Sequence, residues 1–326
     1  MLSNDTITMK PPYTLTSQIL SLVVEISEKL GLVRGANLIK LPTELRKRNR
    51  IKTIQSSLEI EGNTLTVEQI TALLENKRIL APEKDILEVQ NAIQIYDQLD
   101  SMDVYSLDSL LQAHKTLMTG LVSNAGVFRS GAVGIVRGNQ VTHIAPPGHM
   151  VYALMTDLFQ YIQNDEDPGL IKSCVFHYEF EFIHPFTDGN GRMGRLWQTL
   201  LLKEYNPVFE FLPIETLIKK RQDAYYKSLG DSDNAGNSTI FIEFMLTIIN
   251  DSLTDLLSTQ NVIVDGSDRI VIFKSHIGSN KFKRADYLNY FKNISTATAS
   301  RDLKNAVIND ILVKTGDGRT TEYCYL

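Results

Sequence analysis

One run of twelve residues, His-Pro-Phe-Thr-Asp-Gly-Asn-Gly-Arg-Met-Gly-Arg at positions 184–195, constrains this chain more than any other part of its sequence. Glycines at positions 189 and 191 let the backbone approach a ligand, and a helix that begins there presents its positive end to an anion. Arg192 and Arg195 fall in its first turn, on one side. Cations are disfavoured at a helix N-terminus by roughly 0.3–1 kcal/mol each, so two arginines there indicate a bound anion. The run is therefore suited to a polyphosphate.

The same run contains groups that could perform chemistry on a bound phosphate. Asp188 is a hard oxygen ligand of the kind that holds Mg²⁺ together with substrate oxygens. An aspartate at this position could also cap the following helix. His184 stands just before the turn and could accept a proton from an attacking hydroxyl. Taken alone, His184 stays open between a catalytic base and a structural histidine.

The glycines also permit a second interpretation. Gly189, Gly191 and Gly194 have the spacing of a dinucleotide-binding fingerprint, and aromatic residues alternate upstream as they would in a strand. That fingerprint places its glycines directly after a strand, whereas residues 184–188 intervene here. The upstream segment, residues 169–183, also fits the apolar stripe of a helix. The polyphosphate interpretation is therefore the stronger one.

The complete run resembles the signature of the Fic family, HPFx[D/E]GNGRxxR, at every defined position. Members of this family mostly transfer AMP from ATP to protein hydroxyl groups. The resemblance implies that His184 is the general base, that Asp188 binds Mg²⁺, and that ATP is the substrate. The ATP contacts that it implies in this run are Gly189, Asn190, Gly191, Arg192 and Arg195.

Residues 133–145 predict a β-hairpin, with a turn at 137–139 between two β-branched runs. The resemblance implies that this hairpin is the family's flap over the active-site loop, on which a target protein docks as an added strand. Exposed strand edges do bind extended peptides through backbone hydrogen bonds. An ordinary surface hairpin is the alternative. The resemblance further implies that Tyr226, and Asn234 in an expected loop at 231–237, contact adenosine.

The run Ser57-Leu58-Glu59-Ile60-Glu61-Gly62 is similar to the family's inhibitory motif, [S/T]xxxE[G/N], with Ser57 and Glu61 at defined positions. In a helix over about 51–62, Glu61 shares a face with apolar residues and stands in the last turn, where the helix dipole disfavours negative charge. Pairing with Arg195 would stabilise both groups. The family's account is that this glutamate obstructs placement of the γ-phosphate. An exposed terminal glutamate is the alternative.

The periodicity predicts a mainly α-helical chain. Helices are expected near 14–30, 41–61, 66–76, 83–99, 106–120, 148–163, 169–183, 190–205, 214–229 and 238–259. With the resemblance, this pattern predicts an N-terminal helical region (1–105) carrying the inhibitory helix, a Fic catalytic core with its flap (106–260), and a C-terminal winged helix-turn-helix domain (266–326).

The C-terminal part has a different pattern and charge. Residues 269–273 predict a strand, helices are expected near 284–292 and 296–308, and 311–323 predicts a hairpin with a glycine turn. Two helices followed by a two-stranded wing resemble a winged helix-turn-helix. Residues 266–326 carry a net charge of +4 within a chain of net charge -5, which is modest for a DNA-binding module. DNA and a protein partner, including a second copy of the chain in a homodimer, are therefore equally supported.

Composition excludes several classes of protein. The only cysteines are Cys174 and Cys324, which argues against a disulfide framework or a zinc site and favours a cytoplasmic location. The apolar patch at 19–24 is short and soon reaches Glu25 and Glu28, so it predicts neither a signal peptide nor a membrane span. We expect a cytoplasmic protein with no membrane partner.

These observations predict a protein adenylyltransferase that is autoinhibited by Glu61. A different class remains as the alternative, a DNA-binding regulator whose Fic domain senses a nucleotide. A third reading, known from some relatives, is that Glu61 positions a water that removes AMP from modified targets. Labelling of protein by α-labelled ATP separates an enzyme from a sensor.

Overall fold

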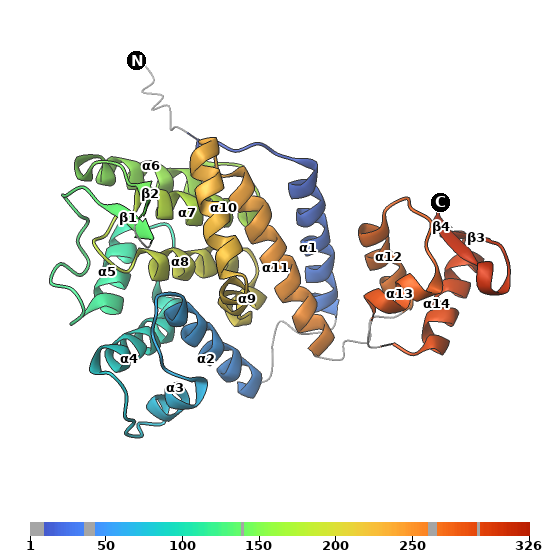
Figure 1. The fold of residues 1–326 in the computed structure, drawn as a ribbon, viewed down its shortest axis with the longest axis horizontal. Helices are drawn as coiled ribbons and strands as arrows, with labels where there is room; N and C mark the ends of the chain where they lie inside the picture. Colours follow the sequence, from blue (N-terminus) through green and yellow to red (C-terminus); the bar gives the residue numbers. More distant parts are fainter. Residues whose placement is uncertain (1–9, 36–42, 138–139, 260–265, 292–293) are drawn as a thin grey trace, which may run out of the picture. The chain divides into compact units, whose positions relative to one another are not determined.

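The computed structural model describes residues 10–35, 43–137, 140–259, 266–291 and 294–326, and it is mainly helical, as predicted (Figure 1). The chain divides into two compact units, Met1–Ile19 with Ile39–Ser252 and Leu20–Leu38 with Leu253–Leu326. Most of α1 (Ser17–Gly35) belongs to the second unit. The three-part division expected from the sequence, with boundaries near residues 105 and 260, stays a prediction.

Helices make up most of the first unit. They are α2 (Thr43–Ile60), α3 (Val67–Leu74), α4 (Glu83–Asp97), α5 (Leu107–Met118), α6 (Val151–Asn164), α7 (Gly169–Ile183), α8 (Asn190–Tyr205), α9 (Ile214–Lys220), α10 (Gln222–Ala235) and most of α11 (Thr239–Thr259). Short 3-10 helices lie at Leu99–Ser101 (η1), Gly148–Met150 (η2) and Pro207–Phe211 (η3). The helices predicted upstream of residue 214 are confirmed, with their ends shifted by a few residues.

Helix α8 runs through the middle of this unit and packs against α7 (Figure 1). Its residues are buried almost without interruption as far as Leu202, which is the pattern of a helix surrounded by protein on all sides. The two helices approach closely at Gly194, where a Cβ atom would come within 2.9 Å of Oε1 of Glu181. The close crossing brings the end of α7 and the start of α8 together, and the 184–195 run connects them.

The predicted hairpin is confirmed. Strands β1 (Gly134–Arg137) and β2 (Gln140–Ile144) pair antiparallel, with a register shift between Ile135 and Val136. Residues 138–139 of the expected turn lie outside the described residues. Among the described strands, β1 and β2 pair only with each other, so each keeps one edge open.

The single helix predicted over 214–229 is wrong. The chain leaves the helical conformation at Arg221 (φ -117°, ψ 33°), whose N–H is shared among carbonyls of the last turn of α9. A second helix, α10, then runs on until Gly236, whose left-handed conformation (φ 66°) ends it. The loop expected at 231–237 is therefore helical as far as Ala235, and Asn234 stands on the last turn of a helix.

The C-terminal part of the second unit contains three helices and a hairpin. These are α12 (Gly266–Ile277), α13 (Arg284–Tyr290), α14 (Thr296–Ile308), β3 (Leu312–Thr315) and β4 (Glu322–Tyr325), with the 3-10 helix η4 (Gly318–Thr320) between the strands. A buried cluster joins them, consisting of Ile270, Phe273, Phe282, Tyr287, Ala299, Leu303, Ala306 and Leu312. The two later helices and the hairpin were predicted correctly; the winged-helix assignment stays a prediction.

The strand predicted at 269–273 is wrong, because these residues belong to α12. The β-branched run favours a strand locally. A helix, however, places Ile270 and Phe273 on one face, where both are fully buried, and leaves Val271 half exposed. Burial of that face within the cluster outweighs the local preference.

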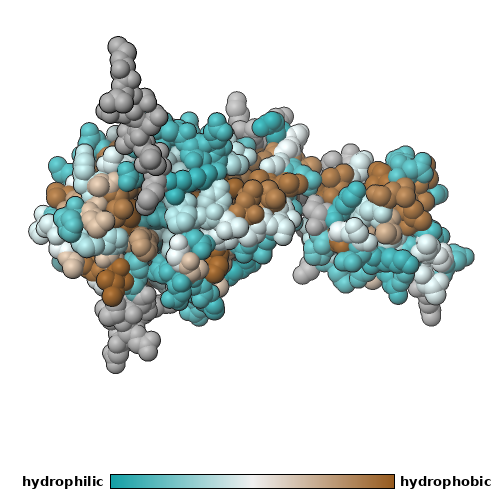
Figure 2. All heavy atoms as spheres, turned by 90° about the horizontal axis from the view of Figure 1, so that it is seen from above, coloured by the Kyte–Doolittle hydropathy of each residue, from teal (hydrophilic) through white to brown (hydrophobic). Residues whose placement is uncertain are grey.

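Hydrophilic residues predominate on the face drawn in Figure 2, and apolar residues form separate patches on it. Exposed apolar side chains in the described residues include Leu20 and Val24 of α1. Within the part of the chain that the structure describes, no helix is both long and apolar enough to cross a membrane.

Candidate functional site

The loop between α7 and α8 has left-handed backbone at both of its ends. His184 caps α7 with φ 49° and ψ 61°, and Gly189 precedes α8 with φ 85°. A left-handed conformation is uncommon for a residue other than glycine and persists only where its surroundings impose it. The residues around His184 therefore hold its backbone in the left-handed conformation.

Arg129 holds this end of the loop. Its guanidinium is buried and donates to main-chain oxygens, from Nε to His184 (2.6 Å), from Nη1 to Gly131 (2.6 Å), and from Nη2 to Pro146 (2.6 Å) and Ile183 (2.9 Å). A cation is favoured there because the carbonyls at the end of α7 carry partial negative charge. Arg129 thus connects the base of the hairpin to the peptide of His184.

His114 and Phe186 support the middle of the loop. Their rings stack with centroids 3.6 Å apart, and Phe186 is fully buried. The N–H of Gly126 donates to Nδ1 of His114 (2.8 Å), so the proton is on Nε2, which donates to the main-chain oxygen of Asp188 (3.0 Å). Burial lowers the pKa of His114 to about 4, which keeps this tautomer neutral.

Asn190 closes the loop from inside. Its Oδ1 accepts from the N–H of Phe186 (2.9 Å), and its Nδ2 donates to the carbonyl of the same residue (2.9 Å). The side chain is buried. Because both ends of the amide bind the loop itself in this conformation, the contact of Asn190 with phosphate or metal stays a prediction.

The imidazole of His184 is arranged to accept a proton. Its Nδ1 lies 3.3 Å from the carbonyl oxygen of Glu181, and since a carbonyl can only accept, Nδ1 carries the hydrogen. The lone pair is then on Nε2. Burial lowers the pKa of His184 to about 4, so the ring is neutral at pH 7. These are the properties of a general base whose ring is oriented by a third group.

The predicted pairing of Glu61 with Arg195 is present. Oε1 of Glu61 accepts from Nη2 of Arg195 at 2.8 Å, and Ser57 accepts from Nε through its hydroxyl (3.1 Å) and from Nη2 through its carbonyl (2.9 Å). Burial alone would lower the pKa of Arg195, but the neighbouring Glu61 carboxylate outweighs it and raises the pKa, so the guanidinium stays charged. Both defined residues of the 57–62 motif thus contact one arginine of the loop.

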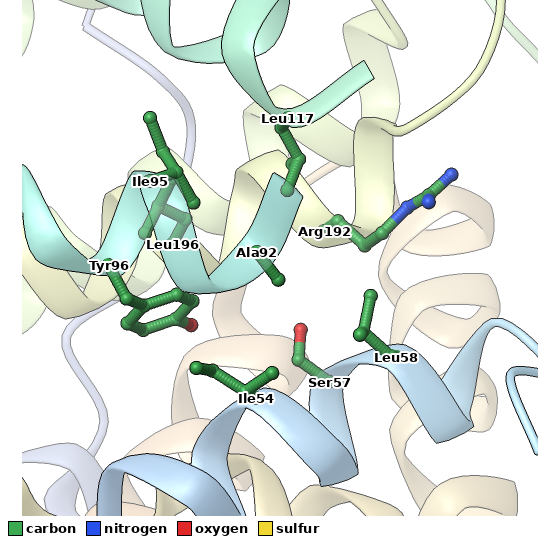
Figure 3. A pocket seen from close by; sticks show the side chains of 9 residues that line it. All are labelled: Ile54, Ser57, Leu58, Ala92, Ile95, Tyr96, Leu117, Arg192 and Leu196. Carbon is green, nitrogen blue, oxygen red and sulfur yellow. The ribbon is translucent and has the colours of Figure 1, made fainter. Parts of the chain in front are cut away.

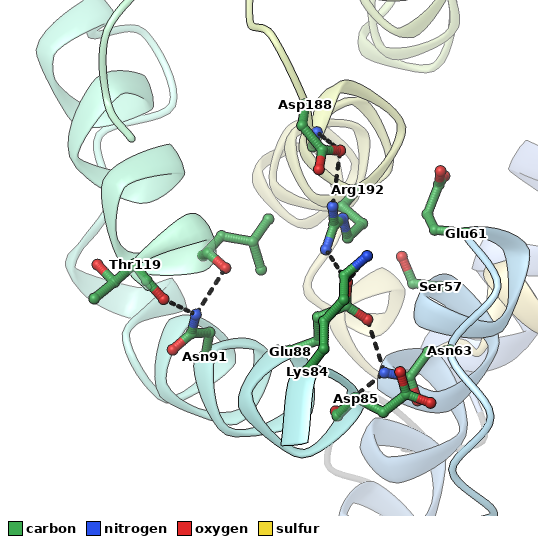
Figure 4. A network of polar contacts seen from close by, with 12 residues as sticks. Ser57, Glu61, Asn63, Lys84, Asp85, Glu88, Asn91, Thr119, Asp188 and Arg192 are labelled. Carbon is green, nitrogen blue, oxygen red and sulfur yellow. Dashed lines mark hydrogen bonds and ion pairs between the residues drawn. The ribbon is translucent and has the colours of Figure 1, made fainter. Parts of the chain in front are cut away.

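Arg192 has a different set of partners, drawn in Figure 4. Its Nη1 lies 3.2 Å from Oε1 of Glu88 on α4, and its Nη2 lies 3.1 Å from Oδ1 of Asp188. Nε of Arg192 is buried and has no hydrogen-bond partner among the described residues. The two arginines of the run are therefore held by separate carboxylates: Glu61, just after α2, binds Arg195, whereas Glu88 and Asp188 bind Arg192.

Asp188 fits the predicted metal ligand. Its side chain is 52% exposed at the turn before α8. Among the described residues, no group of three or more His, Cys, Asp and Glu could hold a metal ion by itself. Mg²⁺ is commonly bound through one or two carboxylates together with substrate phosphates, and a single exposed aspartate beside an anion-binding turn suits that arrangement.

Helix α2 packs closely behind the site. Between α2, α4 and α8 there is a hollow of about 10 Å³, roughly the space of one water molecule (Figure 3). Its lining consists of Ile54, Ser57, Leu58, Ala92, Ile95, Tyr96, Leu117, Arg192 and Leu196. The packing leaves little free volume, so the end of α2 cannot move without disturbing its contacts with α4 and α8.

The two predicted adenosine contacts lie on α10. The ring of Tyr226 is 5.2 Å from that of Tyr225, and burial, followed by the charge of Glu61, raises the pKa of Tyr226. Asn234 is exposed on the last turn of the helix. The structure thus brings Tyr226, but not the side chain of Asn234, into the surroundings of Glu61.

The hairpin is joined to α7 and α10 through His143. Its Nε2 lies 2.8 Å from the carbonyl oxygen of Phe182, and its Nδ1 lies 2.8 Å from Oδ2 of Asp233. Both partners can only accept, so both ring nitrogens donate and the imidazolium form suits this position. Burial opposes that form, but the hydrogen bonds to Asp233 and Phe182 outweigh it and raise the pKa of His143.

Several residues of this site were not assigned a role from the sequence, among them His114, Arg129 and Glu88. His114 had a usable signal, since it lies four positions after Leu110 on the apolar face of α5. Glu88 had one too, because Ala92 and Ile95 follow it at helical spacing on a buried face. The partners of Arg129 could not be read from the sequence, because they are main-chain carbonyls.

Residues 104–202 match the family model described as Fic/DOC family. The chain is 27% identical over 246 residues to protein adenylyltransferase fic-1 of Caenorhabditis elegans, covering 69% of this chain and 45% of that protein. It is 26% identical to protein adenylyltransferase Fic of Nematostella vectensis, covering 66% of this chain and 51% of the relative. The chain therefore spans about half the length of these curated relatives.

Solved structures extend the likeness to the whole chain. The crystal structure of a Fic family protein from Desulfovibrio desulfuricans G20 is 40% identical, covers 98% of both chains and superposes with a TM-score of 0.75. A structure of Fic-1 (aa134 - 508) from C. elegans has a TM-score of 0.60 at 19% identity and shares the fold over 74% of both chains.

Proposed function

Because this chain belongs to the Fic family, we propose that it transfers AMP from ATP to a hydroxyl side chain of a target protein. The observation that carries the proposal is the neutral imidazole of His184, with its lone pair on Nε2, beside a turn that is followed by two buried arginines. A base, an anion-binding helix start and an exposed carboxylate, Asp188, are the groups that a nucleotidyl transfer requires.

In the proposed reaction, Nε2 of His184 accepts the proton of the attacking hydroxyl. The hydroxyl oxygen bonds to the α-phosphorus, the bond from that phosphorus to the oxygen bridging to the β-phosphate breaks, and pyrophosphate leaves. Arg192 and Arg195 stabilise the phosphate charges, and the N–H groups at the turn of Gly189 and Gly191 contact the phosphate oxygens. Asp188 would hold Mg²⁺ together with substrate oxygens, and the ion would supply further neutralisation of the phosphate charge.

Glu61 is proposed to inhibit this reaction. Its carboxylate occupies Nη2 of Arg195 at 2.8 Å, so the arginine is not free to bind the γ-phosphate. The negative charge of the Glu61 carboxylate would also repel a triphosphate bound beside Arg195. In the variant reading known from some relatives, Glu61 positions a water that removes AMP from modified targets.

The target protein is proposed to dock on the hairpin at 133–145. An added strand can pair with an open edge of the two-stranded sheet. The connections of His143 to Phe182 and Asp233 hold the second strand against the helices that carry the site. Tyr226 and Asn234 remain the proposed adenosine contacts.

The two free cysteines agree with the proposed cytoplasmic location.

The second unit supports an alternative or additional role in binding. Helix α14 buries Ala299, Leu303 and Ala306 and exposes Arg301 and Lys304, so its solvent face carries positive charge. Duplex DNA, a protein partner or a second copy of the chain could be recognised there. Binding to duplex DNA that weakens steeply with salt would favour the regulator.

The test of the proposed activity is labelling with two forms of ATP. Compared with lysate alone, lysate with the Glu61→Gly variant is expected to show additional label on protein from α-labelled ATP and no additional label from γ-labelled ATP. Label from the γ-position would indicate phosphoryl transfer instead. Label from neither, although the nucleotide binds, would favour the nucleotide sensor.

A further inference from the structure

Glu88 and Arg192 form a buried ion pair between α4 and α8. Oε1 of Glu88 lies 3.2 Å from Nη1 of Arg192, and the two side chains are 7% and 5% exposed. A buried charge without its partner is strongly unfavourable. Removal of either side chain would therefore leave the charge of the other buried without its partner.

The guanidinium of Arg192 is shared between two carboxylates. Nη1 binds Glu88, and Nη2 binds Oδ1 of Asp188 at 3.1 Å, so the three side chains follow one another from the interior to the turn (Figure 4). Asp188 is 52% exposed and Glu88 is 7% exposed. One positive and two negative charges leave the group with a net charge of -1, and the outer member, Asp188, faces solvent.

The other side of Glu88 is attached to the end of the inhibitory segment. Its Oε2 accepts from Nδ2 of Asn63 at 2.8 Å, and Nζ of the exposed Lys84 lies 3.9 Å from Oε1. The Asn63 side chain is itself fixed, because it also donates to the carbonyl of Asp85 (3.1 Å) and accepts from the N–H of Leu65 (3.0 Å). Asn63 follows directly after the 57–62 motif, so one polar network runs from the end of this segment through Glu88 and Arg192 to Asp188.

We infer that Glu88 is a positioning residue for the metal ligand: it binds Arg192 and thereby keeps Asp188 available to a divalent cation. Without the negative charge of Glu88, Arg192 would have Asp188 as its remaining carboxylate partner among these contacts, and the pair would be neutral. A cation would then compete with the arginine for Asp188. This inference rests on the proposed function, because the cation is the one that accompanies ATP.

The experiment measures binding and does not depend on turnover. The full chain is titrated with α,β-methylene ATP, which cannot release pyrophosphate, once with Mg²⁺ and once with EDTA. The ratio of the two Kd values reports how strongly the metal supports nucleotide binding. In Glu88→Gln this ratio is expected to fall roughly tenfold to a hundredfold, the usual effect of losing a partner behind a metal ligand, while the Kd in EDTA changes little.

Matched variants separate positioning from damage to the fold. Glu83→Gln, on an exposed position of the same helix, is expected to behave as the wild type. Glu88→Asp keeps the charge at a greater distance and is expected to retain part of the metal effect. If Glu88 acts through Arg192, Glu88→Gln has no further effect on the ratio in an Arg192→Met background. Thermal denaturation checks that each variant is folded.

The outcomes are distinguishable. Suppose that the wild type binds the analogue more tightly with Mg²⁺ and that Glu88→Gln shows the same ratio of Kd values. This result overturns the inference and leaves the proposed function standing. If Glu88→Gln weakens binding of the analogue equally in Mg²⁺ and in EDTA, Glu88 has a purely structural role, and the inference is also overturned. If neither the wild type nor Glu61→Gly binds the analogue under either condition, the proposed function is overturned and this inference with it.

Discussion

Oε1 of Glu61 lies 2.8 Å from Nη2 of Arg195, although 134 positions separate the two residues. The arginine side chain is 1% exposed and the glutamate side chain is 33% exposed. The carboxylate therefore has a path to solvent, whereas the guanidinium stays enclosed and keeps its two contacts with Ser57. Loss of Glu61 would free one face of Arg195 without releasing the arginine from its place.

Replacing Glu61 by glycine is expected to raise AMP transfer, including self-modification, roughly tenfold or more, because the freed arginine can bind the γ-phosphate. Labelling with α-labelled ATP measures the change. The control is Glu59→Gly on the last turn of α2, two positions before Glu61, which weakens the helix by roughly 0.5–1 kcal/mol without removing the contact to Arg195.

Arg195→Ala in the Glu61→Gly background is expected to abolish the gain. Equal labelling of wild type and Glu61→Gly would contradict inhibition by this residue. If Glu61 also positions a water for AMP removal, the single variant gains transfer and loses removal of AMP from a modified target.

Replacing His184 by alanine is expected to lower AMP transfer by on the order of 10²- to 10⁴-fold, since general-base catalysis contributes about that much. Binding of Mg-ATP should be largely preserved, because Arg192, Arg195 and Asp188 supply its contacts. Calorimetry and labelling on the same preparation separate the two effects. His149→Ala, at an exposed histidine, serves as the control, and undiminished labelling by His184→Ala would exclude the general-base role.

The acid limb of the pH profile is expected near pH 4. Burial lowers the pKa of His184 to about 4, so the protonated ring, which cannot act as a base, accumulates only below that pH. The negative charge of Glu61 raises the pKa of His184, so the Glu61→Gly variant is not expected to have its acid limb at a higher pH. The measurement is kcat/KM of Glu61→Gly between pH 4 and 8, which reports the free enzyme. A limb near the ordinary histidine pKa of about 6.5 would contradict this environment.

Replacing Arg129 by lysine is expected to destabilise the first unit by about 2–4 kcal/mol. Lysine cannot reproduce the four donations to carbonyls of His184, Gly131, Pro146 and Ile183, which would be left partly unsatisfied. Urea denaturation should show a lower midpoint with an unchanged slope. Arg78→Lys, at an exposed position, is the control and should leave the midpoint unchanged.

A fragment of residues 266–326 is expected to fold alone, because its helices and hairpin share one buried cluster. A dispersed amide NMR spectrum would show this. A fragment that gains dispersion only when residues 20–38 are supplied would place the boundary elsewhere, since those residues belong to the same compact unit.

Much of the site was predictable because its signals are local. The turn at Gly189, the start of α8 and the two arginines follow from residues a few positions apart, and so does the hairpin at 133–145. The pairing of Glu61 with Arg195 was also predictable, since each charge is unfavourable where its own helix places it and the family resemblance named the partner. Where the local pattern was ambiguous, as in α12, prediction failed because burial in the C-terminal cluster decides between strand and helix.

The tertiary structure alone decided which hydrogen-bond donor pairs with which acceptor. Arg192 binds Glu88 across 104 positions, and Nε of Arg129 donates to a carbonyl 55 positions away. No residue pattern specifies such partners, because a buried donor pairs with whatever acceptor the packing brings within about 3 Å, main-chain or side-chain. The sequence by itself determined the chemical groups of the site and the loop that carries them. The packing of α2, α4 and α7 against α8 determined which of those groups are held, shared or left free for a substrate.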